Sequence, residues 1–168
     1  SLALMIALIV DALSDPLIGY LSDNTRSRWG RRHPFMYAAA LPAAIAYYFV
    51  WNPPSGLEGD ALFPYIVTIA VVVRTLVTVY EIPSSSLVAE MSDDYDERTS
   101  MLSYRYFFGW TGGTLMGAFA TLFILVPTTT ISNGMFNVQG HGQVGAIAAM
   151  VIFVAMICLL YTSDAADE

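Results

Sequence analysis

The sequence predicts an all-α membrane protein with five transmembrane helices, and two observations lead to this fold class. Of the 168 residues, 56% are hydrophobic and only 12% are charged, whereas a soluble domain carries about 25% charged residues. Long apolar runs also recur between short polar segments, and each run is close to the ~20 residues that a spanning helix needs. The formal net charge of −7 says little about partners, because acids and arginines are segregated along the chain, and nothing in the sequence resembles a nucleic-acid-binding patch. The expected environment is the lipid bilayer.

Hydropathy places the five spans in order along the chain. The second span opens with Pro34, which the first turn of a helix tolerates. A turn-rich segment, NPPSGLEGD, follows it, and an uncharged segment rich in Gly, Asn and Thr precedes the fifth span. The expected helices cover residues 2–22, 34–51, 62–91, 100–126 and 144–157.

Arginine is concentrated in the loop after the first span. Four of the seven basic residues lie there, whereas the next loop has Glu58 and Asp60 and no basic residue. Positive residues in short loops favour the cytoplasmic side. We therefore expect a multi-pass protein of the cytoplasmic (inner) membrane, with loop 23–33 in the cytoplasm. The four arginines are Arg26, Arg28, Arg31 and Arg32.

The last eleven residues, CLLYTSDAADE, resemble one translated frame of a sequencing-library adapter. We therefore expect a helical bundle over residues 1–157 and a tail of foreign origin over residues 158–168; the alternative is an ordinary polar C-terminus. The only cysteine, Cys158, lies in this tail and supports no redox role. His33 and His141 are single histidines in expected loops, where solvated side chains without a special role are predicted.

The first span carries two acids in its apolar run. Asp11 and Asp15 are four residues apart and therefore share a helix face, which Gly19 continues. An ionised Asp costs roughly 2.5–3.5 kcal/mol at the middle of a span. Pro16 removes a backbone donor and leaves a carbonyl oxygen without its partner. Two carboxylates beside such an oxygen are typical ligands of a small hard cation; the alternative is a structural pair with another helix.

The third span carries a polar stripe. Arg74, Thr78, Glu81 and Ser85 follow one another at intervals of four, three and four residues, which places them on one helix face. Polar residues within a span face the protein interior or a wet cavity. The stripe therefore predicts a functional cavity, and the alternative is a structural ion pair between Arg74 and Glu81.

The fourth span combines one arginine with a face of small residues. Arg105 lies about one turn inside the expected cytoplasmic end, where it can extend toward the interface. Deeper in the span, Gly109, Gly113 and Gly117 recur every four residues. Such spacing favours close helix–helix approach, so we expect a packing surface here.

Two stretches of the chain resemble a known family. Residues 11–35, DALSDPLIGYLSDNTRSRWGRRHPF, resemble the second helix and following loop of the glycoside–pentoside–hexuronide:cation symporters, the melibiose-permease-like branch of the major facilitator superfamily. Residues 78–110, TVYEIPSSSLVAEMSDDYDERTSMLSYRYFFGW, resemble that family's fourth and fifth helices. The resemblance implies that the five spans are the second to sixth helices of a twelve-helix fold. The chain would then be a partial N-terminal half that partners the remainder of its own parent chain.

The resemblance also implies roles for individual residues. Asp11, Asp15 and Thr78 match cation-site positions, and the coupling cation would be Na⁺ or H⁺, with no resident cofactor. Glu81 matches a sugar-binding carboxylate, and Arg105 lies one residue from a sugar-binding arginine. The inner-loop signature of the superfamily is matched by Gly19, Asp23, Arg28, Gly30, Arg31 and Arg32.

One substrate position departs from the family pattern. Ser85 stands where melibiose permease has a tryptophan that stacks on sugar, so a galactoside preference is not expected to carry over. Ser85 itself is retained as a substrate-site residue because it lies on the polar stripe.

These implications predict a secondary transporter rather than an enzyme: cation-coupled symport of a sugar or glycoside. An alternative within the superfamily is transport of a lysolipid or another amphipathic solute. A distant alternative is an intramembrane aspartyl hydrolase. That chemistry needs two carboxylates that face each other and share a proton, whereas Asp11 and Asp15 lie along one helix.

Overall fold

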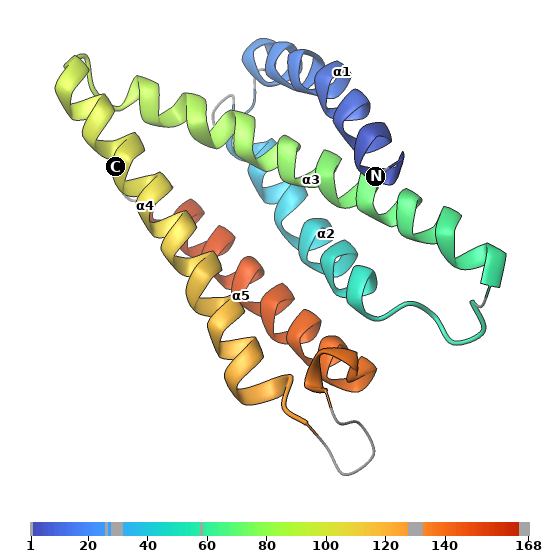
Figure 1. The fold of residues 1–168 in the computed structure, drawn as a ribbon. Coiled ribbons are helices and arrows are strands. Elements are labelled where there is room, and N and C mark those ends of the chain that lie inside the picture. The colour runs from blue at the N-terminus through green and yellow to red at the C-terminus, as the bar shows by residue number, and fades with distance from the viewer. Residues whose placement is uncertain (1, 26, 28–31, 58, 128–132, 165–168) are drawn as a thin grey trace.

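Five long helices make up the part of the protein that the structure describes (Figure 1). The structure is a computed structural model and describes residues 2–25, 27, 32–57, 59–127 and 133–164. No strand occurs within these ranges, so the predicted all-α class is confirmed. The helices are α1 (Leu2–Asn24), α2 (His33–Trp51), α3 (Leu62–Glu90), α4 (Tyr95–Phe119) and α5 (Val138–Asp164). Three short elements join them: the 3-10 turns η1 (Gly59–Ala61) and η3 (Gly134–Phe136), and the π-helical turn η2 (Ala120–Ile124).

Helix α3 is the centre of the arrangement. It packs against α1 on one side and α2 on another, and α2 packs in turn against α5. Helices α1 and α3 run in the same direction, with α2 returning between them in sequence (Figure 1). Helix α4 leaves the end of α3 and makes only a few contacts with it. The bundle is therefore tight around α2 and open along α4.

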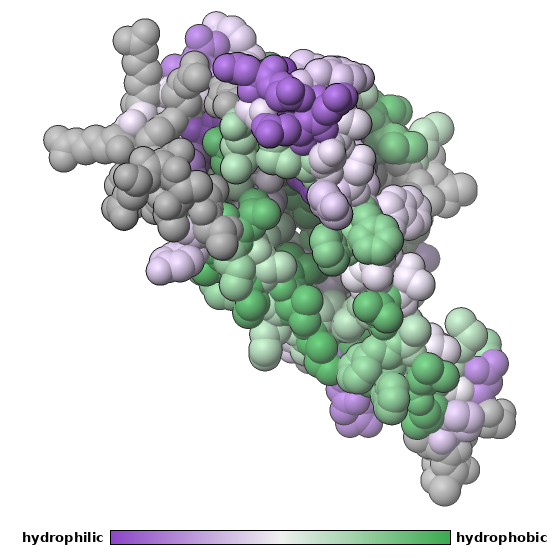
Figure 2. Space-filling model, turned by 90° about the vertical axis from the view of Figure 1, so that its left-hand side faces the viewer, coloured by the Kyte–Doolittle hydropathy of each residue, from purple (hydrophilic) through white to green (hydrophobic). Residues whose placement is uncertain are grey.

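The hydropathy of the helices fits a membrane protein. Within the described residues, four helical segments are long and apolar enough to cross a bilayer: 33–51, 59–88, 95–124 and 138–161. The side chains of part of the first half of α1 lie outside the described residues. Figure 2 shows apolar side chains over the middle of the visible face and a strongly hydrophilic group at its upper end. The protein is a multi-pass membrane protein.

Small residues on α2 bring its neighbours close. The buried core cluster joins Met36 and Ala39 of α2 to Tyr80 of α3 and Leu160 of α5. The Tyr80 hydroxyl donates to the Met156 carbonyl at 3.2 Å and ties α3 to α5. Small side chains allow helix backbones to approach and gain dispersion contacts, because lipid provides no hydrophobic drive between helices. The other buried alanines of α2 are Ala40, Ala43, Ala44 and Ala46.

Helix α4 begins five residues earlier than the predicted residue 100. Asp94 caps it: its carboxylate accepts from the Asp96 amide at 2.7 Å and from the Glu97 amide at 3.2 Å. Asp96 and Glu97 then place negative charge in the first turn, where the helix dipole favours it. Hydropathy alone assigned this acidic stretch to a loop, whereas the capping pattern places it in the helix.

Helix α5 begins six residues earlier than predicted, and both histidines lie in helices. His141 stacks on Trp51 with ring centroids 5.8 Å apart. His33 is the first residue of α2 and is buried. The prediction that both histidines lie in loops is therefore wrong: packing at the start of α2 buries His33, and His141 is half-buried against Trp51 at its end.

The expected foreign tail continues α5. The helix runs to Asp164, and the Leu160 side chain is completely buried, at 0% exposure, in the core cluster. An apolar CLLY segment extends a spanning helix without interruption, whatever its origin, because its hydropathy matches that of the preceding turns. The foreign origin of residues 158–168 stays a prediction.

Candidate functional site

Helices α1 and α3 pack in a constant register. Asp11 contacts Arg74, which lies 63 positions later in the chain. A Cβ on Gly19 would meet the Ile82 side chain at 3.8 Å, and these residues are also 63 positions apart. Two parallel helices therefore pair residue i with residue i + 63 over this stretch. By the same register, Asp15 lies level with Thr78.

Asp11 is the buried acid of the pair. The residue is 6% exposed, and the Arg74 Nε donates to Asp11 Oδ2 at 2.8 Å. The Arg74 Nη2 also donates to the same oxygen. The prediction left an Arg74–Glu81 pair open as the structural alternative; the structure instead pairs Arg74 with Asp11, across the helix interface.

The second acid, Asp15, has a different environment. It is exposed, one helical turn below Asp11, and Thr78 is half-buried on the neighbouring helix. Pro16 lies inside α1, so the Ala12 carbonyl between the two acids lacks its usual helical donor. The structure thus brings Asp11, Asp15 and Thr78 to one segment of the α1–α3 interface. The spacing predicted the shared face of the two acids, and the family resemblance implied the place of Thr78 beside them.

The oxygen set suits a hard cation better than a soft transition metal. It offers two carboxylates, one hydroxyl and one backbone carbonyl, which are hard ligands. Within the described residues, no group of three or more His, Cys, Asp or Glu side chains could hold a metal ion. A divalent metal centre of nitrogen or sulfur ligands is therefore not what these residues offer.

A pocket of about 470 Å³ lies between α3 and α4. It contains an acid, a base and two aromatic rings, and glycines form part of its wall. Because α3 and α4 make few contacts, their polar side chains remain open to this space. The lining residues are Glu81, Arg105, Tyr106, Gly109, Trp110, Gly113 and Thr114.

The predicted substrate residues meet at this pocket. Arg105 Nη1 donates to Ser85 Oγ at 2.9 Å and so joins α4 to α3. Glu81 is exposed one helical turn before Ser85 and lines the same space. The cluster therefore combines hydroxyl donor, carboxylate acceptor and guanidinium donors, which is what polyhydroxylated ligands require.

Two glycines of the α4 face, Gly109 and Gly113, line the pocket and not a helix interface. A Cβ on Gly109, Gly113 or Gly117 would meet no atom within 4 Å among the described residues. The expected helix–helix contact is therefore absent from the described part of the chain. The physical reason is the divergence of α4 from α3, which leaves this face without a neighbour.

Sequence reasoning missed the aromatic residues of the pocket. Trp110 is 78% exposed, and Tyr106 precedes it by one helical turn on the same face. Their spacing of four, with Arg105 beside Tyr106, was the available signal. An aromatic ring next to charged groups is a common way to bind the apolar face of a polar ligand.

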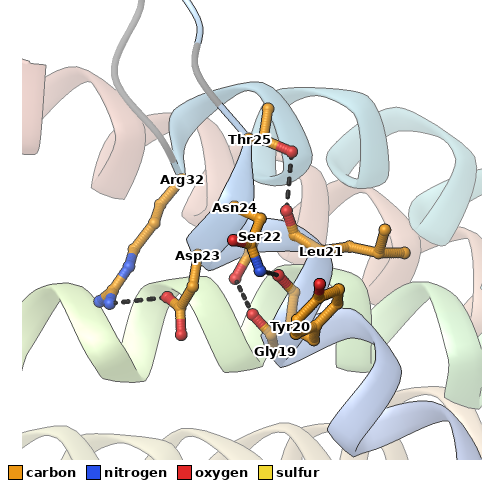
Figure 3. Close-up of polar contacts among 8 residues, drawn as sticks. All are labelled: Gly19, Tyr20, Leu21, Ser22, Asp23, Asn24, Thr25 and Arg32. Atoms are coloured by element: carbon orange, nitrogen blue, oxygen red, sulfur yellow. Dashed lines mark hydrogen bonds and ion pairs between the residues drawn. The ribbon is translucent and has the colours of Figure 1, made fainter.

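The inner-loop motif is described only in part. Arg32 Nη2 donates to Asp23 Oδ1 at 3.1 Å and closes the connection between α1 and α2 (Figure 3). Gly19 lies in α1, where its carbonyl accepts from Ser22 Oγ at 3.1 Å (Figure 3). The other predicted members, Arg28, Gly30 and Arg31, lie outside the described residues.

Known proteins resemble this chain over most of its length. An uncharacterized symporter of Synechocystis sp. is 34% identical over 165 residues, covering 95% of this chain and 29% of that protein. The isoprimeverose transporter of Lactiplantibacillus pentosus is 29% identical over 155 residues, covering 89% of this chain and 31% of that protein. The sodium-dependent lysophosphatidylcholine symporter 1 of Mus musculus is 33% identical over 109 residues, covering 62% of this chain and 20% of that protein.

The chain spans about a third or less of the length of these relatives. The relatives are named as transporters and symporters. A family model described as MFS/sugar transport protein matches residues 1–166. With its all-helical fold and its polar residues gathered on adjoining helices, the chain belongs to the MFS/sugar transport protein family of the major facilitator superfamily.

Proposed function

We propose that this chain forms part of a secondary active transporter that couples a monovalent cation to a sugar or glycoside. The observation that carries the proposal is that α3 borders two polar sites at different levels along its length, the acid pair of α1 and the α3–α4 pocket. Coupled transport needs two binding sites whose occupancies influence one element, and α3 is such an element.

The proposed cation ligands are Asp11, Asp15 and Thr78. Na⁺ or H⁺ would relieve the repulsion of two carboxylates that lie one turn apart. The Ala12 carbonyl adds an oxygen at the same level because Pro16 cannot donate to it. Asp15 is the more accessible carboxylate and would be the first to meet the cation.

The proposed substrate residues are Glu81, Arg105 and Ser85. Glu81 would accept hydroxyl hydrogens of a sugar, and Arg105 would donate to its oxygens from the position that the Ser85 hydroxyl supports. Trp110 would supply the stacking surface for the apolar face of a pyranose ring. The tryptophan absent at position 85 would then have a substitute on the facing helix.

The rest of the transporter would complete the mechanism. Alternating access needs two bundles that move about a central site, and the relatives are about three times as long as this chain. In the full-length protein of the cytoplasmic membrane, the loop from Asp23 to Arg32 would face the cytoplasm. The Asp23–Arg32 pair would hold the inner ends of α1 and α2 together in one conformation.

A second candidate substrate is a lysolipid. Two observations favour it: the similarity to the sodium-dependent lysophosphatidylcholine symporter 1 of Mus musculus, and the α3–α4 pocket, where the Tyr106 and Trp110 rings are exposed beside Arg105. A headgroup phosphate would pair with the Arg105 guanidinium, while acyl carbons would lie against the apolar rings.

The test uses the full-length transporter that carries this segment, reconstituted in liposomes. Radiolabelled glycosides and lysophosphatidylcholine are offered in separate assays, each with a Na⁺ gradient, a pH gradient or neither. The sugar proposal expects uphill glycoside accumulation under one cation gradient. Cation-driven uptake of lysophosphatidylcholine alone would select the second candidate, and uptake that no cation gradient drives would refute both.

A further inference from the structure

Arg74 is a charged residue at the α1–α3 interface that the proposed cation site does not use. It lies in the middle of α3, and two of its nitrogens bind one oxygen of Asp11. The other oxygen, Asp11 Oδ1, is buried and has no hydrogen-bond partner among the described residues. One carboxylate oxygen is thus bound to a cation of the chain itself, and the other faces the interface unpartnered.

The guanidinium of Arg74 performs the electrostatic task of a bound cation. A buried carboxylate without a compensating charge is unfavourable, and Asp11 is 6% exposed. In this arrangement the compensating charge comes from α3 and needs no ion from solution. An external cation that binds Asp11 must therefore either displace Arg74 or share the carboxylate with it, and two positive charges on one carboxylate repel each other.

We propose that Arg74 is a tethered counter-cation that neutralises Asp11 when the coupling cation is absent and competes with that cation for the carboxylate. This inference rests on the proposed function, because it assumes that Asp11 belongs to the cation site. The inference adds a residue that tunes the cation site, because the strength of the Arg74–Asp11 pair sets the cation concentration at which the site fills.

After release from Asp11, the positive charge of Arg74 would still be attracted by other acids. Its side chain is 56% exposed, so little packing holds it in place. Asp15 and Glu81 also attract it electrostatically. Glu81 lines the α3–α4 pocket, so displacement of Arg74 by a cation would carry positive charge along α3 toward the substrate residues.

The net charge of the two sites agrees with displacement by a single cation. Three carboxylates, on Asp11, Asp15 and Glu81, face two guanidinium groups, on Arg74 and Arg105, which leaves one net negative charge. One monovalent cation neutralises this set. Arg74 then changes partner without leaving the chain with an uncompensated charge in the bilayer.

The experiment measures cation affinity in the full-length transporter that carries this segment. The purified protein is titrated with NaCl at constant ionic strength against choline chloride, and the rise in melting temperature gives an apparent Kd for Na⁺. A parallel pH titration in choline chloride gives the apparent proton affinity. The variants are Arg74→Gln, which cannot neutralise Asp11, and Arg74→Lys, which keeps the charge.

Arg74→Gln is expected to raise the apparent affinity for the coupling cation about tenfold, because a competitor that holds Asp11 for about nine-tenths of the time lowers apparent affinity by that factor. Arg74→Lys is expected to change it less than about threefold, since the ammonium still competes. An unchanged or weaker cation affinity in Arg74→Gln overturns the inference. Asp15→Asn separates the two proposals. If this variant loses the cation-dependent rise in melting temperature while Arg74→Gln leaves the cation affinity unchanged, the proposed cation site stands and only the role of Arg74 is removed.

A second measurement uses the wild-type full-length transporter and does not depend on whether Arg74→Gln folds. Infrared difference spectra are recorded with and without the coupling cation. Displacement of Arg74 from Asp11 is expected to shift a guanidinium band, and Arg74→Lys must remove that shift, which assigns the band to Arg74 among all the arginines of the full-length transporter. A cation-induced spectrum without a guanidinium shift contradicts competition.

Discussion

The two polar regions that lie at different levels along α3 use the same residue types in opposite ways. At the α1–α3 interface, Asp11 is buried and bound by Arg74. At the α3–α4 pocket, Glu81 is exposed, and Arg105 is held by the neutral hydroxyl of Ser85. One region neutralises its own charge, whereas the other keeps charged groups available.

The spacing of the helices accounts for this difference. Helices α1 and α3 pack closely in one register, so a carboxylate there loses water and requires a charged partner. Helices α3 and α4 diverge, so their side chains keep access to a pocket of about 470 Å³. A tight interface suits a small cation, and an open one suits a larger organic ligand. The following predictions test this contrast in the full-length transporter that carries the segment.

The largest effect is expected from the acid pair. Asp15→Asn or Asp11→Cys removes a carboxylate from the proposed cation site, so cation-stimulated uphill accumulation is expected to be lost. Substrate binding without cation should survive, because the proposed substrate groups lie on α3 and α4. Uptake and binding are measured side by side with and without Na⁺ and across pH. Full cation stimulation in both variants would remove the cation role from this region.

The next effect concerns the charged groups of the pocket. Glu81→Gln and Arg105→Gln each leave ligand groups without a charged partner, at a cost of about 1–3 kcal/mol in binding free energy. Equilibrium binding of the transported substrate gives this loss directly. Ser100→Ala, on an exposed residue of α4 that lies outside the pocket, is the matched control and should bind normally. Unchanged substrate affinity in both pocket variants would show that Glu81 and Arg105 have a structural role and do not bind substrate.

A smaller effect is expected for the aromatic wall. Trp110→Ala removes the proposed stacking surface and should weaken substrate binding by about 0.5–1.5 kcal/mol. Trp110→Phe keeps an aromatic face and should retain most of the affinity. A ligand titration followed by calorimetry compares the two variants. Equal losses in both would argue against stacking, since the ring would then not be the feature that matters.

The smallest effect is expected at the inner loop. Asp23→Asn breaks a pair whose carboxylate is largely exposed, so water screens the interaction, and exposed pairs are worth about 0–1 kcal/mol. The melting temperature should hardly change. The transport rate should change more than the substrate affinity, because the pair is proposed to hold one conformation. A large loss of stability would instead make it a structural link.

The periodicity of the sequence was sufficient to predict the fold class and the polar face of α3. The apolar runs predicted an all-α membrane protein, because only hydrogen-bonded helices or closed barrels satisfy the backbone within lipid. The spacing of Arg74, Thr78, Glu81 and Ser85 predicted one polar face on α3. Helix boundaries were less accurate where polar caps extend a helix beyond its apolar part, as Asp94 does for α4.

Only the tertiary structure decided which charged groups meet. Arg74 and Glu81 share a helix face but are two turns apart, about 10 Å along the axis, whereas Asp11 comes from another helix, 63 positions away. That partner depends on the register of α1 against α3, which no local pattern encodes. The pocket likewise depends on the divergence of α4, which leaves Trp110 and the glycine face open. The sequence by itself thus determined which residues are polar within the spans, and helix packing determined which of them compensate one another and which remain open to a ligand.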